Sequence, residues 1–280
     1  MKEKQTMQDR FLEACYSSTL GRMLLKPFVC KPFSMVMGWL LDSKLSAVII
    51  PWYQKIMKID MTDVADQTYD SFNDFFTRKL KEDARPFCDE NQELPSPCDG
   101  RAMVFPIDEN SRLMVKHTSY SVKQLLCSSK LAKQYEGGTA VLLRLTVADY
   151  HRYCYPVSGQ KSINRRIEGK YHTVNPIAND IMPIYKMNTR EYTKIQSTIY
   201  GPVIQMEVGA LCVGRIVNYV EKAYVRSGEE KGRFEFGGSS ILLFFEKGKV
   251  DFREDLLIAS RLGQETQVRM GESLGEPIHM

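Results

Sequence analysis

Hydrophobic positions in the first third of the chain recur at helical spacing. In residues 8–25 the apolar side chains are three or four positions apart, which predicts an amphipathic helix: Phe11, Leu12, Cys15, Tyr16, Leu20 and Met23. A second helical pattern covers residues 34–58, with a break expected near Pro51. The segment "TYDSFNDFFTRKLKEDARP" predicts a short third helix, because Asp70 or Ser71 can cap its start and Pro86 stops it.

From Leu94 onward the pattern changes to short runs rich in Val, Ile, Leu, Tyr and Phe between Gly, Pro, Asn and Ser. These runs predict strands at 101–106, 139–147, 152–156, 162–169, 202–208, 211–217, 234–236 and 241–247. The helical crossovers that parallel strands require are not visible. The sequence therefore predicts an α+β fold, with a helical N-terminal region (1–70) before a predominantly antiparallel β-sandwich or barrel (71–280).

Charge gives the N-terminal region a second meaning. Residues 1–60 hold nine Lys or Arg against five Asp or Glu, an excess of 9 − 5 = +4 that equals the net charge of the whole chain. Both tryptophans, Trp39 and Trp52, lie in the same segment. Basic, Trp-containing apolar helices are typical of membrane-surface anchors, and the other interpretation is an amphipathic helix packed on the core.

No segment has the roughly 20 consecutive apolar residues of a membrane-spanning helix, and no signal peptide is recognisable. Seven scattered cysteines without a CxxC pair argue against a disulfide framework and a structural zinc site. We therefore expect a peripheral protein at the cytoplasmic face of the cell membrane, with no metal and no nucleic-acid partner.

The stretch "FEFGGSSILLFF" (234–245) interrupts two apolar runs with Gly237, Gly238, Ser239 and Ser240. Glycine inside a strand is costly and marks a bend or a close approach of the backbone to another group. Because side chains alternate along a strand, only one of the two serines can face a given site.

Two other polar residues follow or precede predicted strands: Asp99 in "SPCDG" and His151 in "VADYHRYCYPVSG". Asp99 is also explained as an ordinary turn residue, and His151 as a structural histidine that donates to a loop carbonyl. Together with Ser239 they can form a base-activated nucleophile, in which the aspartate fixes the imidazole tautomer and the imidazole takes the hydroxyl proton.

The target of that nucleophile is more consistent with the chain itself than with an external ester. The hydrolase elbow GxSxG requires glycine where this chain has Ile241, and a strand follows instead of a helix. Attack by Ser239 on the carbonyl of Gly238 would convert the amide to an ester. Elimination at residue 239 would then cut the chain and, after hydrolysis, leave a pyruvoyl group.

These residues resemble the phosphatidylserine decarboxylase family, whose members are proenzymes that cut themselves. The resemblance runs from about residue 70 to the C-terminus, over segments that occur in the order the family shows: "SFNDFFTRKLKEDARP", "SPCDG", "DYHRYCYPVSG", "HTVNPIA" with "NTRE", "EVGALCVGRI", "KGRFEFGGSSILLFFEKGKV" and "ETQVRMGESLG". It implies cleavage between Gly238 and Ser239, and catalytic roles for Asp99, His151 and Ser239.

The resemblance further implies a covalent pyruvoyl cofactor derived from Ser239, which forms a Schiff base with the substrate amine and serves as the electron sink for loss of CO2. Phosphatidylserine would become phosphatidylethanolamine at a phospholipid membrane surface. The cleaved chains, 1–238 and 239–280, would stay together as a heterodimer, with a higher oligomer as an additional possibility. We expect His151 to return a proton to the substrate, which would need a pKa near the working pH.

The sequence departs from the family pattern at two positions. Cys154 stands where a second histidine is common, and Ser240 replaces threonine. Two alternatives therefore stay open: a decarboxylase of a soluble amino acid on the same scaffold, and a non-catalytic lipid-binding relative.

Overall fold

The N-terminal region is helical, as predicted. The computed structural model describes residues 7–115, 117–210, 215–237 and 239–278. Its first helical elements are α1 (Met7–Ser17), α2 (Thr19–Leu25), α3 (Lys31–Asp42), the 3-10 helix η1 (Lys44–Ile49), α4 (Ile50–Met57), α5 (Phe72–Phe76) and the 3-10 helix η2 (Glu82–Ala84).

The helix boundaries differ from the predicted ones for local reasons. Residues 8–25 form two helices, because the Ser18 hydroxyl accepts the Gly21 N–H at 2.9 Å and starts a second helix. The break predicted near Pro51 lies at Ser43. Pro51 instead occupies the first turn of α4, where its missing N–H costs nothing. The third helix is much shorter than predicted, and Ser71 caps its start by accepting the Asp74 N–H at 3.1 Å.

The rest of the described chain is mainly strands with short helices between them. The strands are β1 (Gly100–Pro106), β2 (Arg112–Val115), β3 (Thr118–Ser121), β4 (Thr139–Leu145), β5 (Arg152–Cys154), β6 (Gly159–Lys161), β7 (Arg165–Ile167), β8 (Arg190–Ser197), β9 (Gly201–Val208), β10 (Ile216–Asn218), β11 (Tyr224–Val225), β12 (Glu230–Phe234), β13 (Ser239–Phe245), β14 (Val250–Phe252), β15 (Thr266–Val268) and β16 (Gly275–Pro277). The helices are α6 (Val122–Leu126), α7 (Ser129–Gln134), α8 (Pro176–Ile181), α9 (Ile184–Met187) and α10 (Glu254–Arg261).

One large sheet organises the fold. Its strand order is β11-β6-β8-β9-β13-β4-β1-β15, with β7 paired to β8, and a smaller sheet has the order β10-β12-β5. The hairpin β2-β3 and the pair β14-β16 stand apart from both. Every pairing between these strands is antiparallel, so the predicted α+β class with antiparallel sheets is confirmed. Strand β8 was not among the predicted strands, because its "REYTKIQS" carries charged residues, which the sheet buries or partly buries.

The large sheet has a hydrophobic core on each face. Leu242 and Phe244 of β13 pack with residues of α1 and α6–α9 on one face. Ile241, Leu243 and Phe245 pack on the other face with the small sheet and α10. Strand β13 lies between β4 and β9 and is buried along its whole length, which makes its start a rigid position for a reactive group.

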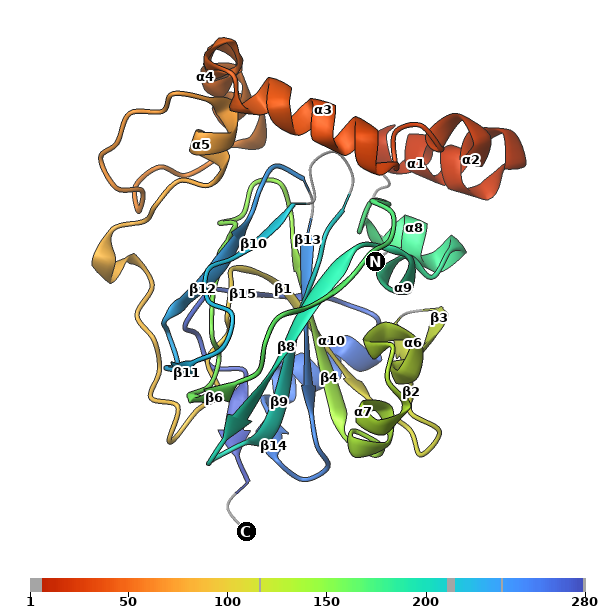
Figure 1. Cartoon of the computed structure of the whole chain (residues 1–280), viewed down its shortest axis with the longest axis vertical. Coiled ribbons are helices and arrows are strands. Elements are labelled where there is room, and N and C mark those ends of the chain that lie inside the picture. The colour runs from red at the N-terminus through yellow and green to blue at the C-terminus, as the bar shows by residue number, and fades with distance from the viewer. Residues whose placement is uncertain (1–6, 116, 211–214, 238, 279–280) are drawn as a thin grey trace.

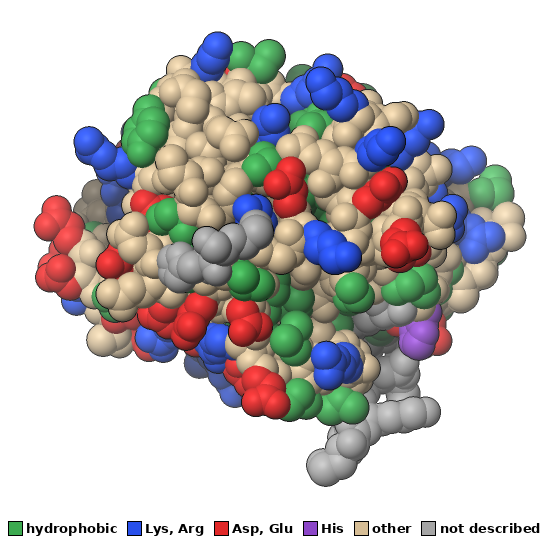
Figure 2. Space-filling view, turned by 90° about the horizontal axis from the view of Figure 1, so that it is seen from below, with side chains coloured by type: hydrophobic (Ala, Val, Ile, Leu, Met, Phe, Trp, Pro, Cys, Tyr) green, Lys and Arg blue, Asp and Glu red, His purple; other side chains and the backbone are tan. Residues whose placement is uncertain are grey.

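Helices α1–α5 lie together across one end of the sandwich, and the C-terminus lies at the other end (Figure 1). Strand β13 begins at the helical end. Seen from below, the opposite end shows acidic and basic side chains interspersed, with hydrophobic side chains in small separate groups (Figure 2). At the helical end, by contrast, large apolar side chains such as Trp39 and Trp52 are exposed, so the two ends present different surfaces.

Candidate active site

Ser239 occupies the first position of β13, opposite Leu145 at the end of β4. It is fully buried and shares a strand face with Ile241 and Leu243, toward the core between the two sheets. Ser240 is equally buried but shares the other face, with Leu242. The prediction that the two serines point to opposite faces is confirmed.

His151 faces Ser239 from the loop that follows β4. Asp149 shapes this loop by accepting the Thr146 N–H at 2.6 Å. The loop returns the chain so that His151 Nε2 lies 2.9 Å from the Thr146 carbonyl oxygen, and Nδ1 lies 3.3 Å from Ser239 Oγ. A carbonyl can only accept, so Nε2 carries the proton and Nδ1 presents its lone pair to the serine hydroxyl.

The surroundings of His151 favour its neutral form. The imidazole is fully buried, and the Phe76 ring lies against it with centroids 4.1 Å apart and planes 30° apart. Burial lowers the pKa of His151 to about 3, and the positive charge of Arg78 acts in the same direction. The expectation of a pKa near the working pH is therefore wrong for the uncut chain. His151 stands ready as a base, and once protonated it would release the proton readily.

Asp99 is held by other partners. Its carboxylate accepts two hydrogen bonds from the Arg85 guanidinium, at 2.9 and 2.7 Å, and one from the Met270 N–H at 2.8 Å. Thr146 occupies the ring nitrogen that the sequence analysis gave to Asp99. The prediction that Asp99 fixes the imidazole tautomer is therefore wrong. The interpretation of His151 as a donor to a loop carbonyl is correct, and the same ring also contacts Ser239.

The two glycines next to these residues are required by the backbone. Gly100 has φ +155°, and a Cβ there would lie 2.8 Å from the Arg144 carbonyl oxygen of the neighbouring strand. Gly237 has φ 142°, a conformation that other residues rarely adopt. Gly238, the predicted cleavage position, lies outside the described residues.

Cys154 lies on β5, with its Sγ 3.5 Å from the Met270 sulfur. Burial raises the pKa of its thiol to about 12, so the sulfur stays protonated. Its neighbours are Tyr150 and Met270. Cys154 therefore packs against Met270, the residue whose N–H binds Asp99. It does not hydrogen-bond to His151, whose two ring nitrogens lie against Thr146 and Ser239.

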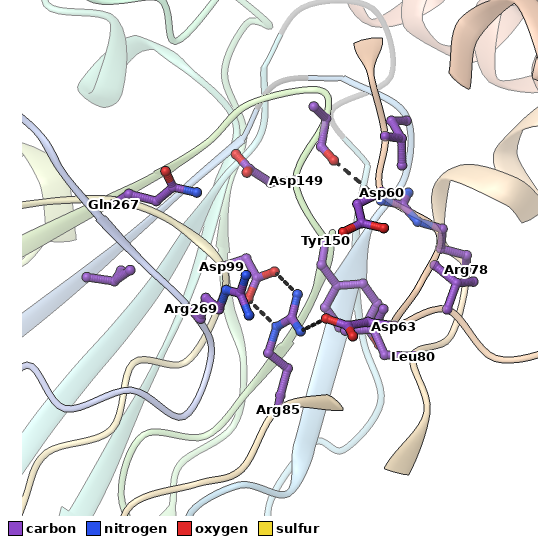
Figure 3. Close-up of a pocket in the computed structure, with 14 residues that line it drawn as sticks. Asp60, Asp63, Arg78, Leu80, Arg85, Asp99, Asp149, Tyr150, Gln267 and Arg269 are labelled. Carbon is purple, nitrogen blue, oxygen red and sulfur yellow. Dashed lines mark hydrogen bonds and ion pairs between the residues drawn. The ribbon is translucent and has the colours of Figure 1, made fainter. Parts of the chain in front are cut away.

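A cavity of about 140 Å³ lies against the loop that leads to His151, and the loop residues Ala148, Asp149 and Tyr150 form part of its wall (Figure 3). Ser239 and His151 themselves are not among its lining residues. Its lining is strongly charged, with Asp60, Asp63, Asp99, Asp149, Arg78, Arg85 and Arg269. Arg85 bridges two of these carboxylates, because it also binds Asp63 at 2.9 Å (Figure 3).

The sequence analysis missed the contributions of Thr146, Phe76 and Arg78. A backbone carbonyl leaves no signal in a sequence, and Phe76 reads as an ordinary core residue of the short helix. Arg78 offered a signal, because a cation follows the phenylalanine-rich segment "FNDFFT" directly. Of the other histidines, His172 is buried against Tyr16 and His117 is exposed, so neither belongs to this site. His279 lies outside the described residues.

In this site a buried serine hydroxyl lies against a neutral imidazole whose tautomer is fixed, which is the arrangement of a base-activated serine nucleophile. Comparison with known proteins narrows this class. The family model described as phosphatidylserine decarboxylase matches residues 72–276. The chain belongs to the phosphatidylserine decarboxylase family, and the resemblance seen in the sequence is confirmed.

Curated relatives match along nearly the whole chain. A protein of Clostridium acetobutylicum, named phosphatidylserine decarboxylase proenzyme 2, is 41% identical over 276 residues, which cover 98% of this chain and 94% of the relative. Proteins named phosphatidylserine decarboxylase proenzyme are 42% identical in Clostridium tetani, over 88% of this chain and 84% of the relative, and 41% identical in Clostridium botulinum, over 95% and 92%. The match therefore includes the N-terminal helices.

Proposed function

We propose that this chain is a self-processing carboxy-lyase that converts phosphatidylserine to phosphatidylethanolamine and CO2. Family membership supports the reaction. The observation that carries the self-processing is the placement of Ser239 Oγ 3.3 Å from Nδ1 of a histidine whose other nitrogen donates to Thr146.

The cleavage follows from the protonation state of His151. Nδ1 accepts the Ser239 hydroxyl proton while Oγ attacks the carbonyl of the preceding residue, Gly238. The imidazolium, formed where burial disfavours charge, passes the proton to the departing amide nitrogen. Elimination follows at residue 239: its Cα loses a proton to a base, the Cβ–Oγ bond breaks, and Gly238 leaves as the terminal carboxylate of residues 1–238. The dehydroalanine at the start of residues 239–280 tautomerises to an imine and takes up water, which releases ammonia and would leave the pyruvoyl group.

The pyruvoyl cofactor proposed at residue 239 fits its position. Strand β13 is hydrogen-bonded to β4 and β9, so a new chain end at residue 239 would stay anchored in the sheet. When present, the group would supply the carbonyl that serves as electron sink for decarboxylation. His151 would pass a proton to the substrate carbon when CO2 leaves, after first taking one up at Nδ1, because its resting form is neutral. Asp99, through Arg85 and Met270, would act as a positioning residue.

We further propose that residues 1–70 form a membrane-surface region and residues 71–280 the catalytic domain. Of the 21 large hydrophobic side chains that are exposed among the described residues, 13 lie in residues 20–56. These are Leu20, Met23, Leu24, Phe28, Met35, Val36, Trp39, Leu40, Leu45, Val48, Ile49, Trp52 and Ile56, and we call them the apolar face. Exposed apolar clusters of this extent mark interaction surfaces.

The apolar face suits a lipid surface. Exposed lysines accompany it, at Lys26, Lys31, Lys44, Lys55 and Lys58, and lysine favours anionic headgroups. In the described chain no single helix meets the length and hydropathy of a membrane span; only the pair Lys31–Asp42 and Lys44–Met57, bent by 78°, meets them jointly. We propose that the helices lie on the membrane, at its cytoplasmic face.

The helices also connect the apolar face to the reactive pair. On their inner side, Tyr53 of α4 donates its hydroxyl to the Val147 carbonyl at 2.8 Å, within the loop that leads to His151. Tyr53 also packs edge-to-face on Phe72 and Phe236. A lipid headgroup at the apolar face would thus lie at the end of the sandwich where β13 begins (Figure 1).

The test is CO2 release from phosphatidylserine in vesicles, compared with free serine and aromatic amino acids. We expect two bands on a denaturing gel and release from the phospholipid. Two bands with CO2 release only from a free amino acid would contradict phosphatidylserine as the substrate. A single full-length band without release would contradict the activity and favour a non-catalytic lipid-binding protein.

A further inference from the structure

Arg78 is a buried cation without a carboxylate partner among the described residues. It is only 4% exposed, and Nε and Nη1 have no hydrogen-bond partner. Nη2 donates to the Ala148 carbonyl at a long 3.4 Å, and the guanidinium lies 5.3 Å from the centre of the Phe75 ring. One long hydrogen bond and one ring contact leave most of its five donors unused, which is costly for a buried charge.

The Arg78 side chain lines the cavity that borders the loop leading to His151. Figure 3 shows Arg78 on the opposite side of the cavity from Gln267. Its Nη2 is directed to the Ala148 carbonyl. Arg78 follows Phe76, which lies on the His151 ring, by two residues. Its charge also contributes to lowering the pKa of His151. A group bound to Arg78 would therefore lie close to the site of chemistry.

The other charges of the cavity are already satisfied in part. Arg85 forms ion pairs with both Asp63 and Asp99. Asp149 accepts the Thr146 N–H, and Asp60 accepts two hydrogen bonds from Thr62. Arg269 is exposed at the cavity rim. Arg78 is thus the buried cation of this cavity whose charge is left for a ligand.

We propose that Arg78 binds the phosphodiester of the phospholipid headgroup. The proposal rests on the proposed function, which supplies a substrate with two anionic groups, a phosphodiester and a carboxylate. A guanidinium paired with the carboxylate would stabilise the ground state and oppose its departure as CO2. The phosphodiester keeps its charge throughout the reaction, so its binding energy is retained. The planar fork of arginine matches two phosphate oxygens at once.

The phosphodiester contribution is measurable as a ratio of two inhibition constants. Ethanolamine and sn-glycero-3-phosphoethanolamine share the amine of the product and differ in the glycerophosphate. Each is tested as a competitor of phosphatidylserine decarboxylation by the processed enzyme, and the ratio does not depend on the fraction of active protein. We expect glycerophosphoethanolamine to inhibit the wild type at least tenfold more strongly.

In Arg78→Gln this ratio should fall at least tenfold, toward one. Arg78→Lys should retain part of it, because the charge stays and the fork is lost. Arg261→Gln removes an exposed arginine at the end of α10, outside the cavity lining, and should keep the wild-type ratio.

Three results would overturn the proposal: a wild-type ratio near one, an unchanged ratio in Arg78→Gln, and equal weakening of both inhibitors as a purely structural role predicts. If Arg78→Gln fails to fold, Arg78→Lys decides, and a full wild-type ratio in that variant counts against the proposal. Failure of the wild type to decarboxylate phosphatidylserine would contradict the proposed function instead. Calorimetric titration of glycerophosphoethanolamine into the same variants would then still test Arg78.

Discussion

The sandwich and the N-terminal helices differ in where their large apolar side chains lie: the sandwich buries them, and the helices expose many of them. In the sandwich, all seven residues of β13 are buried, and even the Glu207–Lys231 ion pair is fully enclosed. In α2–α4 and η1, large apolar side chains point outward, with Trp39 72% and Trp52 67% exposed. In the sandwich the apolar side chains of β13 are enclosed by the chain itself, whereas the helices present a surface that a lipid layer would cover. Processing should therefore depend on the first region, and membrane binding on the second.

The largest effect is expected at the nucleophile. Ser239→Ala removes the attacking hydroxyl, so the chain should remain a single full-length band on a denaturing gel. Ser240→Ala is the matched control, because this equally buried neighbour faces the other side of the sheet, and it should be cut normally. If Ser239→Ala were still cut, or if only Ser240→Ala failed to be cut, the assignment of Ser239 as the nucleophile would be wrong.

His151→Gln should slow processing by roughly 10²-fold or more, the usual contribution of a general base. Glutamine can still donate to the Thr146 carbonyl but cannot take the serine proton. The rate is measured as conversion of freshly translated chain on a gel, and vesicle sedimentation of the same variant should equal wild type. A processing rate within a few-fold of wild type would exclude His151 as the base.

Asp99→Asn should mainly affect stability. It leaves the mostly buried Arg85 guanidinium without its bidentate partner, which costs about 3 kcal/mol of unfolding free energy for an ion pair of this burial. Asp63→Asn is the matched control, since Asp63 binds the same arginine from a 42% exposed position and should cost about 1 kcal/mol or less. Urea denaturation measures both.

The same Asp99→Asn variant separates two roles for this aspartate. A positioning role predicts slower processing than wild type, with a smaller loss than in His151→Gln. If stable Asp99→Asn protein were blocked as completely as His151→Gln, Asp99 would act on the imidazole directly, against the arrangement found here.

Trp39→Ala with Trp52→Ala should weaken binding to anionic vesicles on the order of 100-fold, because burying each of these large apolar side chains is worth about 1.5–3 kcal/mol. Processing should proceed at the wild-type rate, since neither side chain contacts the sandwich core clusters. Ile258→Ala with Leu262→Ala, two exposed apolar residues at α10, is the matched control and should leave sedimentation unchanged. Equal loss in both double variants would remove the distinction between the two regions.

The smallest change is expected in the pH profile of processing. Because the pKa of His151 is lowered to about 3, its base form persists, and the cleavage rate should stay flat from pH 8 to 5. A halving near pH 6.5 would show an imidazole of ordinary pKa and contradict this burial.

Stability should depend on pH where processing does not. The unfolded chain binds protons at His151 and His172 near pH 6.5, whereas the folded chain resists them, with pKa values of about 3 and 4. The stabilising contribution is thus full above pH 6.5 and lost as pH falls toward 4 and below. Thermal melts of uncut Ser239→Ala should show this decline.

The sequence by itself determined the class of the fold, the order of helices before strands, and the candidates Ser239 and His151. Period-two alternation also separates Ser239 from Ser240, because successive side chains of any strand point to opposite faces. The basic, Trp-containing N-terminal segment was equally readable from composition.

Only the tertiary structure decided which groups meet. Thr146 orients His151 through a backbone carbonyl, an atom that every residue possesses, so no residue type announces it. Asp99 pairs with Arg85 because the chain brings two distant segments together, and a sequence shows charges without their partners. Burial lowers the pKa of His151, and desolvation depends on everything packed around a group and not on its neighbours in the chain. The same packing leaves Nε and Nη1 of Arg78 without hydrogen-bond partners.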